Sequence, residues 1–191
     1  MTLIFATNNE NKIKEMNTLL VNGLSIISLK DAGINIDIPE PHKTIEENAT
    51  EKATVIYNLT NQNCFGEDTG LEVAALNGAP GVRSARYAGE DCNHKNNITL
   101  LLKNMANIVN RNARFKTVIS CIINGVENQF TGICEGKIMY EQIGDMGFGY
   151  DAIFVPQGAD KTFAQMNMEE KNIFSHRQKA MTKLIAYLNQ L

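Results

Sequence analysis

The stretch from Arg114 to Ile138 limits the possible folds of this chain more than any other. The run 114–123 has the two-residue period of a β-strand, and the dipeptide Asn124-Gly125 separates it from a second run, 129–138, that is expected to return as a strand. One face of the first run carries Phe115, Thr117, Ile119, Cys121 and Ile123. Asn-Gly between two such runs is typical of a two-residue hairpin turn, because both residues adopt positive φ readily. The sequence therefore predicts a long β-hairpin.

Helical and extended patterns alternate along the rest of the chain. Short apolar runs predict strands at 2–6, 25–29 and 152–155. Apolar residues at helical spacing predict helices after the polar turn 7–12, over 44–59, over 91–105 and from Ser175 to the C-terminus, the last with Leu191 facing inward. Together with the hairpin, these elements predict an α/β fold with a mixed sheet flanked by helices and a cleft across its middle.

Length and composition describe an ordinary globular chain. With 191 residues, of which 43% are hydrophobic, we expect one domain with its own core. The net charge of −3 gives no reason to expect a nucleic acid as partner. Four widely spaced cysteines without a CxxC pair indicate reduced thiols. With no signal peptide or apolar span, we expect a cytoplasmic protein without a membrane partner.

Two adjacent acids, Glu67 and Asp68, follow an apolar run and precede Thr69-Gly70. We expect them at the end of a strand, where successive side chains face opposite ways, so that at most one can point into a given cleft. A polar turn is the more common explanation of such a tetrapeptide. Alone, the pair does not decide between a turn and a site.

Two further polar segments could bind an anion or a metal ion. The turn Thr7–Lys12 leads from a strand into a helix, with Asn8 or Asn9 as the N-cap, and such a turn suits phosphate. Glu40 lies between two prolines, which suits either a placed ligand or a rigid turn. Lys52 falls off the inward stripe of the helix over 44–59, and a plain solvated side chain is one explanation of it.

The C-terminal third adds a glycine-rich loop and a basic pair. Residues 144–151 contain three glycines around Phe148 and Tyr150, but a strand follows where a dinucleotide fingerprint requires a helix. His176 and Arg177 lie in the first turn of the last helix, which is unfavourable for cations unless an anion or a base edge is bound there. A solvated surface pair is the alternative.

Taken together and in order, these segments resemble one known family. The matching blocks are Ala6-Thr-Asn-Asn-Glu-Asn-Lys-Ile-Lys-Glu15, Glu47-Asn-Ala-x-x-Lys52-Ala, Glu67-Asp-Thr-Gly-Leu71, Gly78-Ala-Pro-Gly-Val-Arg-Ser-Ala-Arg-Tyr87, Phe148-Gly-Tyr-Asp151 and Ser175-His-Arg177. These blocks resemble those of the inosine triphosphate pyrophosphatases, also called XTP/dITP diphosphatases. The resemblance covers residues 4 to about 188 and implies an ITPase-like fold, with a long twisted sheet and an active-site cleft between two lobes.

The resemblance implies hydrolysis of ITP, dITP and XTP to the monophosphate and pyrophosphate, with Mg²⁺ as cofactor and a homodimer as the assembly. Asp68 would be the catalytic acid or base and, with Glu40, a metal ligand, while Lys12 and Lys52 would complete the catalytic set. The triphosphate would be held by Thr7, Asn8, Asn9, Glu10, Asn11, Lys12 and Thr69. The base would be held by Phe148, Gly149, Tyr150, Asp151, Lys171, His176 and Arg177. Asn8 and Asn11 depart from the family pattern, which often has glycine at both positions.

Three other functions stay open at this stage. A nucleotide-binding regulator would have lost the acid at position 68 or the lysines, and the sequence keeps both. A septum-inhibitor-type nucleotide pyrophosphatase is disfavoured by Ser175-His-Arg177. A metal phosphatase would release orthophosphate. Donors such as His176 or Arg177 would favour a 6-oxo purine over adenine, but rejection of guanine has to involve the 2-position.

Overall fold

The computed structural model describes residues 1–20 and 23–191, which form two compact units. The first unit comprises Met1–Asp68, Thr117–Gly132 and Arg177–Leu191, and the second comprises Thr69–Lys116 and Ile133–His176. The strands are β1 Thr2–Phe5, β2 Ser25–Ser28, β3 Cys64–Val73, β4 Pro80–Gly81, β5 Asn112–Ile123, β6 Val126–Ile138 and β7 Phe154–Pro156. The α-helices are α1 Glu10–Asn17, α2 Ile45–Thr60, α3 His94–Asn104, α4 Met168–Phe174 and α5 His176–Leu188. Short 3-10 turns lie at Ala74–Leu76, Ser84–Arg86, Asp151–Ile153 and Phe163–Gln165.

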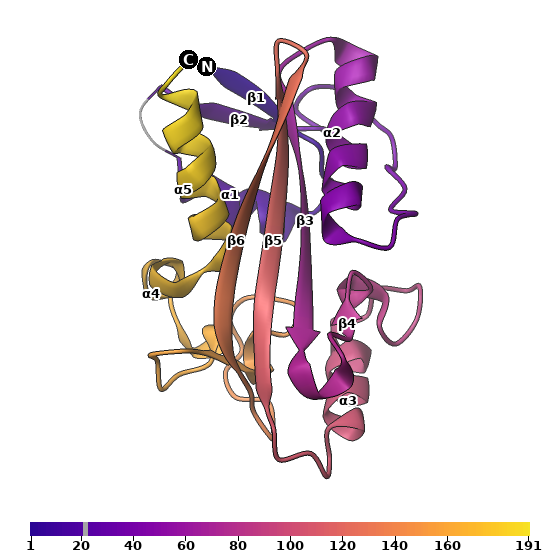
Figure 1. Ribbon diagram of the computed structural model, residues 1–191, viewed down its shortest axis with the longest axis vertical. Helices are drawn as coiled ribbons and strands as arrows, with labels where there is room; N and C mark the ends of the chain where they lie inside the picture. Colours follow the sequence, from indigo (N-terminus) through magenta and orange to yellow (C-terminus); the bar gives the residue numbers. More distant parts are fainter. Residues whose placement is uncertain (21–22) are drawn as a thin grey trace. The chain divides into compact units, whose positions relative to one another are not determined.

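The described strands form one mixed sheet, as the sequence predicts. Their order is β2-β1-β3-β5-β6-β7, and β4 pairs with β3 off this path. β1 runs parallel to both β2 and β3, whereas β4 and β7 pair antiparallel with β3 and β6. The three long strands β3, β5 and β6 lie next to one another and contribute residues to both units (Figure 1).

The hairpin between β5 and β6 confirms the strongest expectation from sequence. Asn124 and Gly125 have φ angles of 50° and 82°, the positive values that a two-residue hairpin turn requires. The backbone N–H of Asn124 also donates to the side chain of Asn63 at 2.9 Å. Local turn chemistry therefore determines where this chain reverses.

In the first unit, the strands bury both of their faces. Leu3 and Phe5 of β1 pack in a cluster with residues of α1 and α5, whereas Ile4 and Ala6 pack in another cluster with residues of α2. β3 divides its side chains in the same way, with Phe65 in the first cluster and Cys64 in the second. Figure 1 shows α5 and α2 on opposite sides of these strands. Period-two alternation thus supplies two apolar surfaces, and each surface is covered by helices.

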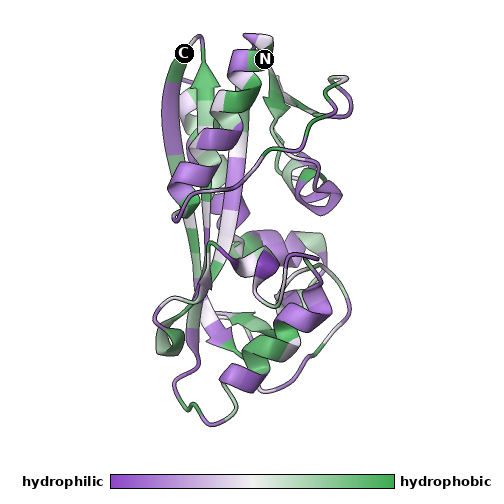
Figure 2. Ribbon diagram, turned by 90° about the vertical axis from the view of Figure 1, so that its right-hand side faces the viewer, coloured by the Kyte–Doolittle hydropathy of each residue, from purple (hydrophilic) through white to green (hydrophobic). Residues whose placement is uncertain are grey.

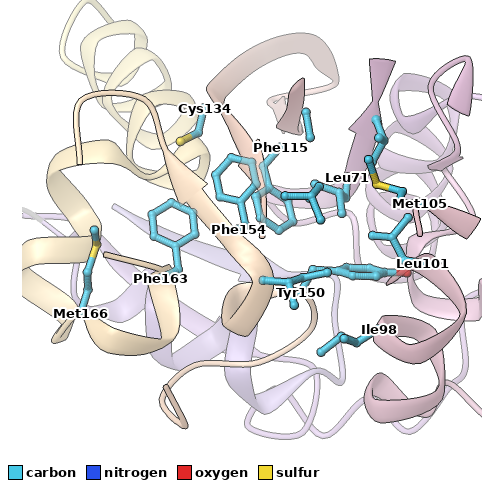
Figure 3. Packing of buried hydrophobic residues seen from close by; sticks show 14 residues of the cluster. Leu71, Ile98, Leu101, Met105, Phe115, Cys134, Tyr150, Phe154, Phe163 and Met166 are labelled. Atoms are coloured by element: carbon cyan, nitrogen blue, oxygen red, sulfur yellow. The ribbon is translucent and has the colours of Figure 1, made fainter. Parts of the chain in front are cut away.

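The second unit has its own core, which is rich in aromatic side chains. Phe115, Phe154 and Phe163 lie close together, with Tyr150, Leu71 and Leu101 beside them (Figure 3). The Phe115 and Phe154 rings meet edge to face, with their centroids 4.7 Å apart. Such pairs contribute about 0.5–1.5 kcal/mol beyond the area that they bury.

The helix starts follow the capping residues in the sequence. Asn9 caps α1, and Thr44 caps α2 by accepting a hydrogen bond from the Glu47 backbone N–H at 3.2 Å. Hydrophilic and hydrophobic bands alternate along the helices, the pattern of helices that bury one face (Figure 2). Within the described ranges, no helix combines the length and apolar character that crossing a bilayer would need.

Two expectations from sequence are wrong in detail, one open alternative is excluded, and one helix was not predicted. Glu67 and Asp68 lie in the middle of β3 rather than at its end, because β3 continues through Val73 to pair with β4. Lys52 is only 6% exposed, because carboxylates from outside its helix surround it. Leu191 is 67% exposed, since α5 ends at Leu188. The short helix α4, which precedes α5, has no counterpart among the predicted elements.

Candidate active site

The two acids of β3 point to opposite faces of the strand, as the alternation predicts. Asp68 reaches Lys52 on α2, with the ammonium nitrogen 3.0 Å from Oδ1. Glu67 reaches Lys12 on α1, with 2.6 Å between Lys12 Nζ and Oε2. Both carboxylates are at least 95% buried. The two acids therefore have different partners and different surroundings, although they are neighbours in sequence.

Lys52 joins two carboxylates from different parts of the chain. Its ammonium group contacts Oδ1 of Asp68 and Oε1 of Glu40, and it donates to the main-chain oxygen of Glu67 at 3.2 Å. Lys12 Nζ lies 3.4 Å from the same main-chain oxygen. Two cations thus converge on the backbone that carries Asp68, and they bring positive charge to a buried acidic site.

A glycine on β3 permits this arrangement. A Cβ atom at Gly66 would lie 2.3 Å from the carbonyl oxygen of Ala49 and 2.7 Å from Cβ of Lys52. The backbone of α2 therefore rests directly on β3, at the helical turn from which Lys52 projects. Any larger residue at position 66 would push this turn away from the strand.

The charged groups of this cluster shift one another's pKa. Burial raises the pKa of Asp68 above its usual range. The positive charges of Lys52 and Lys12 act in the opposite direction, but their effect on this pKa is smaller. Burial alone would lower the pKa of Lys52, but the negative charges of Asp68 and Glu40 outweigh burial and raise it. Lys52 is therefore held as a cation, and Asp68 accepts a proton more readily than a solvated aspartate.

The donor set fits a hard divalent cation. Asp68 Oδ2 is buried and has no hydrogen-bond partner among the described residues. Glu40 adds a second carboxylate, which is joined to Asp68 through Lys52. Within residues 1–20 and 23–191, no cluster of three or more His, Cys, Asp or Glu side chains forms a complete metal site. Mg²⁺ is commonly held by one or two carboxylates together with substrate phosphate, so the two carboxylates suffice.

Glu67 belongs to a buried ion-pair network with Arg177. The guanidinium Nε of Arg177 donates to Glu67 Oε1 at 3.1 Å, and its NH1 nitrogen pairs with Glu15. All three side chains are at most 4% exposed. The carboxylates of Glu67 and Glu15 explain why the Arg177 cation is stable in the first turn of α5. The sequence had suggested that a bound anion or base edge would stabilise it.

The turn before α1 is organised by the side chains of Asn9 and Asn8. Oδ1 of Asn9 accepts hydrogen bonds from the backbone N–H groups of Asn11 and Lys12 at 3.0 and 3.2 Å. Asn8 donates to the carbonyl oxygen of Ile36 at 2.9 Å. Neither Asn8 nor Asn11 has a positive φ, so this turn does not need glycine at either position.

In the second unit, a buried ion pair gathers several of the residues expected to bind the base. Lys171 Nζ lies 2.6 Å from Oδ2 of Asp151, and the backbone N–H of Phe148 donates to the same oxygen at 2.9 Å. Lys171 also lies over the rings of Phe148 and Phe163, 5.5 and 5.2 Å from their centroids. A cation, a carboxylate and aromatic faces are thus combined, which suits recognition of a planar polar group.

The other residues expected at the substrate have contacts of their own, and His176 lies near the same Phe163 ring as Lys171, with 6.3 Å between the His176 and Phe163 centroids. The ring of His176 stacks on Phe115, with 4.6 Å between centroids. The hydroxyl of Tyr150 donates to the carbonyl oxygen of Ser84 at 2.9 Å. Gly149 has a φ of +63°, which favours glycine. Arg177 belongs to the first unit and Thr69 to the second.

Glu15, Asn48 and Gly66 were not predicted to shape this site. Glu15 pairs with Arg177, Asn48 bonds to the backbone of His42, and Gly66 receives α2. Glu15 and Asn48 are 4% and 0% exposed, and their signal in the sequence was their place in the blocks Ala6–Glu15 and Glu47–Ala53 rather than the helical pattern. Gly66, inside a predicted strand, signals a close backbone approach.

Comparisons with known proteins show what the chain as a whole is similar to. The model of the Ham1 family matches residues 3–187. The dITP/XTP pyrophosphatase of Flavobacterium psychrophilum is 50% identical over 187 residues, with 98% of each chain covered. Among solved structures, the Ham1 protein of Staphylococcus aureus has a TM-score of 0.89 at 37% identity, covering 100% of this chain and 99% of its own. A HAM1 protein from Coxiella burnetii has a TM-score of 0.90 at 34% identity, with both chains covered completely.

Proposed function

The chain belongs to the Ham1 family, and from that premise we propose that it hydrolyses non-standard purine nucleoside triphosphates. ITP, dITP and XTP would be cleaved between the α and β phosphates to give the nucleoside monophosphate and pyrophosphate. Such an enzyme would remove deaminated purines from the nucleotide pool. The whole chain, residues 1–191, would act as one catalytic domain.

One observation carries the proposal: the buried carboxylate oxygen Oδ2 of Asp68, which has no hydrogen-bond partner among the described residues. A buried acceptor of this kind is costly unless a ligand satisfies it. The cations Lys12 and Lys52 nearby suit a polyphosphate, and Glu40 suits a metal ion bound to it. Acids alone would fit many metal sites, but acids together with two lysines, one of them buried, favour a metal-bound triphosphate.

Asp68 and Glu40 would hold Mg²⁺, with Asp68 contributing Oδ2. When bound, the cation would neutralise charge on the phosphate oxygens. Asp68 would also orient the attacking water and accept its proton, for which the raised pKa of this carboxyl is suited. Lys12 and Lys52 would stabilise the negative charge on the departing pyrophosphate.

Two sets of residues would bind the two parts of the substrate. Thr7, Asn8, Asn9, Glu10, Asn11, Lys12 and Thr69 would bind the triphosphate, and Phe148, Gly149, Tyr150, Asp151, Lys171, His176 and Arg177 would bind the base. The Phe148 ring offers a stacking surface, and Lys171 is a donor suited to the 6-oxo group of hypoxanthine or xanthine. Adenine presents an amino group at that position and would leave the donor unpaired.

The contacts of Arg177 favour a supporting role at this site. Its ion pairs with Glu67 and Glu15 hold α5 against β3 and α1. Arg177→Ala would therefore lower stability as well as the preference for ITP over GTP. An unchanged ITP-to-GTP ratio in a folded variant would remove Arg177 from the base site.

The assembly and location of the protein are also proposals. We propose a homodimer in the cytoplasm, to which the loop Gly78–Tyr87 could contribute contacts, and we propose no nucleic-acid or membrane partner. The net charge of −3 supports the last point. Sedimentation equilibrium would give the mass of the assembly directly.

The deciding experiment is product analysis. The protein is incubated with ITP, XTP, dATP and GTP in the presence of Mg²⁺, and the phosphate products are separated. We expect monophosphate and pyrophosphate, with ITP and XTP turned over faster than dATP and GTP. Orthophosphate as the sole product would indicate a metal phosphatase, equal rates on dATP and ITP would overturn the substrate class, and absence of turnover would favour a nucleotide-binding regulator.

A further inference from the structure

The segment that carries Glu40 is held against α2 in a regular way. From Ile34 to Glu40 the side chains alternate between half-buried and exposed. Ile34, Ile36 and Ile38 pack on the cluster that contains Ala53 and Ile56 of α2. Glu40 is the next residue in the same alternation, so the three isoleucines turn its carboxylate towards α2.

Asn48 of α2 fixes the far end of this segment. Its side-chain oxygen accepts a hydrogen bond from the backbone N–H of His42 at 3.0 Å, and its amide nitrogen lies 3.4 Å from the carbonyl oxygen of the same residue. Asn48 is completely buried. A buried amide that satisfies both backbone groups of one residue acts as a two-point clamp.

The clamp is connected to Glu40 by a stiff link. Pro41 is the single residue between Glu40 and His42, and its ring fixes φ. Asn48 and Lys52 are four residues apart on α2, so they lie on the same face of the helix one turn apart. One helix face therefore binds the backbone after Glu40 through Asn48 and the Glu40 carboxylate through Lys52.

We propose that Asn48 is a positioning residue that holds Glu40 at the metal-binding end of the site. This inference rests on the proposed function, in which Glu40 is a metal ligand. The bond from Asn8 to Ile36 supports the near end of the same segment. Removing groups that orient a metal ligand typically lowers metal affinity about 10–100-fold.

Asn48→Ala should raise the Mg²⁺ concentration for half-maximal ITP hydrolysis about tenfold, with a smaller change in KM for ITP at saturating Mg²⁺. Asn97→Ala is the matched control, because Asn97 is 2% exposed and bonds to the backbone of Ala88 and Ala85, both at 2.7 Å. The control should lose comparable stability and keep the wild-type Mg²⁺ dependence. An equal shift in both variants would reduce Asn48 to a structural role and overturn the proposal.

A double-mutant cycle with Glu40→Gln tests whether Asn48 acts through Glu40. In the Glu40→Gln background, Asn48→Ala should change the Mg²⁺ requirement less than about twofold. A full tenfold effect in that background would refute the proposed route. Pro41→Ala, which keeps the clamp and loosens the link, should shift the Mg²⁺ requirement in the same direction as Asn48→Ala, and an unchanged requirement would contradict the stiff link.

Two readouts do not depend on turnover. Trypsin should cleave after the exposed Lys43 faster in Asn48→Ala than in the wild type or in Asn97→Ala, since the clamp lies one residue away. Mn²⁺ binding, followed by electron paramagnetic resonance of the free ion with pyrophosphate present, should weaken in the same variant. Unchanged cleavage and unchanged binding would overturn the role of Asn48 even in an active enzyme. If ITP is not hydrolysed at all, the proposed function fails, while these two readouts still decide the role of Asn48.

Discussion

Replacing Gly66 by alanine tests how closely α2 has to approach β3. The added Cβ would lie 2.3 Å from the Ala49 carbonyl oxygen and 2.8 Å from the Ala53 backbone nitrogen. Both neighbours are backbone atoms, so no side-chain rotation relieves the contact. An ordinary contact begins at 3.4 Å, so the helix and strand would have to separate by about 1 Å.

This separation has two consequences of different size. Overpacking of this kind costs about 1–3 kcal/mol of the free energy of unfolding. The same shift would lengthen the 3.0 Å contact between Lys52 and Asp68, and a displacement of about 1 Å at a reacting group can lower the rate about 100-fold. We therefore expect kcat for ITP to fall by much more than the loss of folded protein explains.

The assay combines urea unfolding with steady-state kinetics on Gly66→Ala and a matched control. Gly136→Ala is the control, because its Cβ would lie 2.3 Å from the Val155 carbonyl oxygen in the second unit. It should lose similar stability and keep kcat once corrected for the folded fraction. If Gly66→Ala keeps both stability and kcat, the close packing of α2 on β3 is refuted. If both variants lose kcat equally, the link from Gly66 to Lys52 is refuted.

Three further perturbations follow from the buried charges and thiols. Asp68→Asn should lower kcat about 10²–10⁴-fold while cooperative unfolding persists, and retained turnover would transfer the catalytic role to Glu40 or Glu67. Lys171→Met should lower the free energy of unfolding in urea by about 3–5 kcal/mol, because it removes the counter-ion of Asp151. Adding Asp151→Asn should recover part of this loss, and a further loss would contradict the explanation. Burial raises the pKa of Cys121 from 9.0 to about 12, so its contribution to stability is complete below pH 9 and lost as the pH rises towards 12. As the pH rises from 8 to 10, the free energy of unfolding of the wild type should therefore fall by about 1.4 kcal/mol more than that of Cys121→Ala. Equal losses would refute the raised pKa of Cys121.

Local patterns in the sequence predict much of this fold. The Asn124-Gly125 turn, the Thr44 cap of α2 and the mixed sheet are where the sequence indicates them. Each depends on backbone preferences or side-chain periodicity within a few residues. The alternation of isoleucines from 34 to 38 carried the same kind of information, in a segment outside the predicted helices and strands.

The charged centre depends on contacts that sequence spacing does not reveal. Lys52 is buried because Asp68 and Glu40, on other segments, compensate its charge. Arg177 pairs with Glu67 and Glu15, which are 110 and 162 residues away in sequence. A helix pattern classifies these residues as solvated because it contains no information about distant counter-ions.

The way the first unit is assembled from the chain affects how the protein is made. Its apolar cluster joins Leu3 and Phe65 to Ala180, Met181 and Leu184 of α5. A nascent chain on the ribosome cannot complete this cluster before α5 has been synthesised, whereas every segment of the second unit precedes Arg177. The unit that carries Asp68 is therefore the last to be finished during translation, so a chain interrupted before α5 would lack a completed first unit.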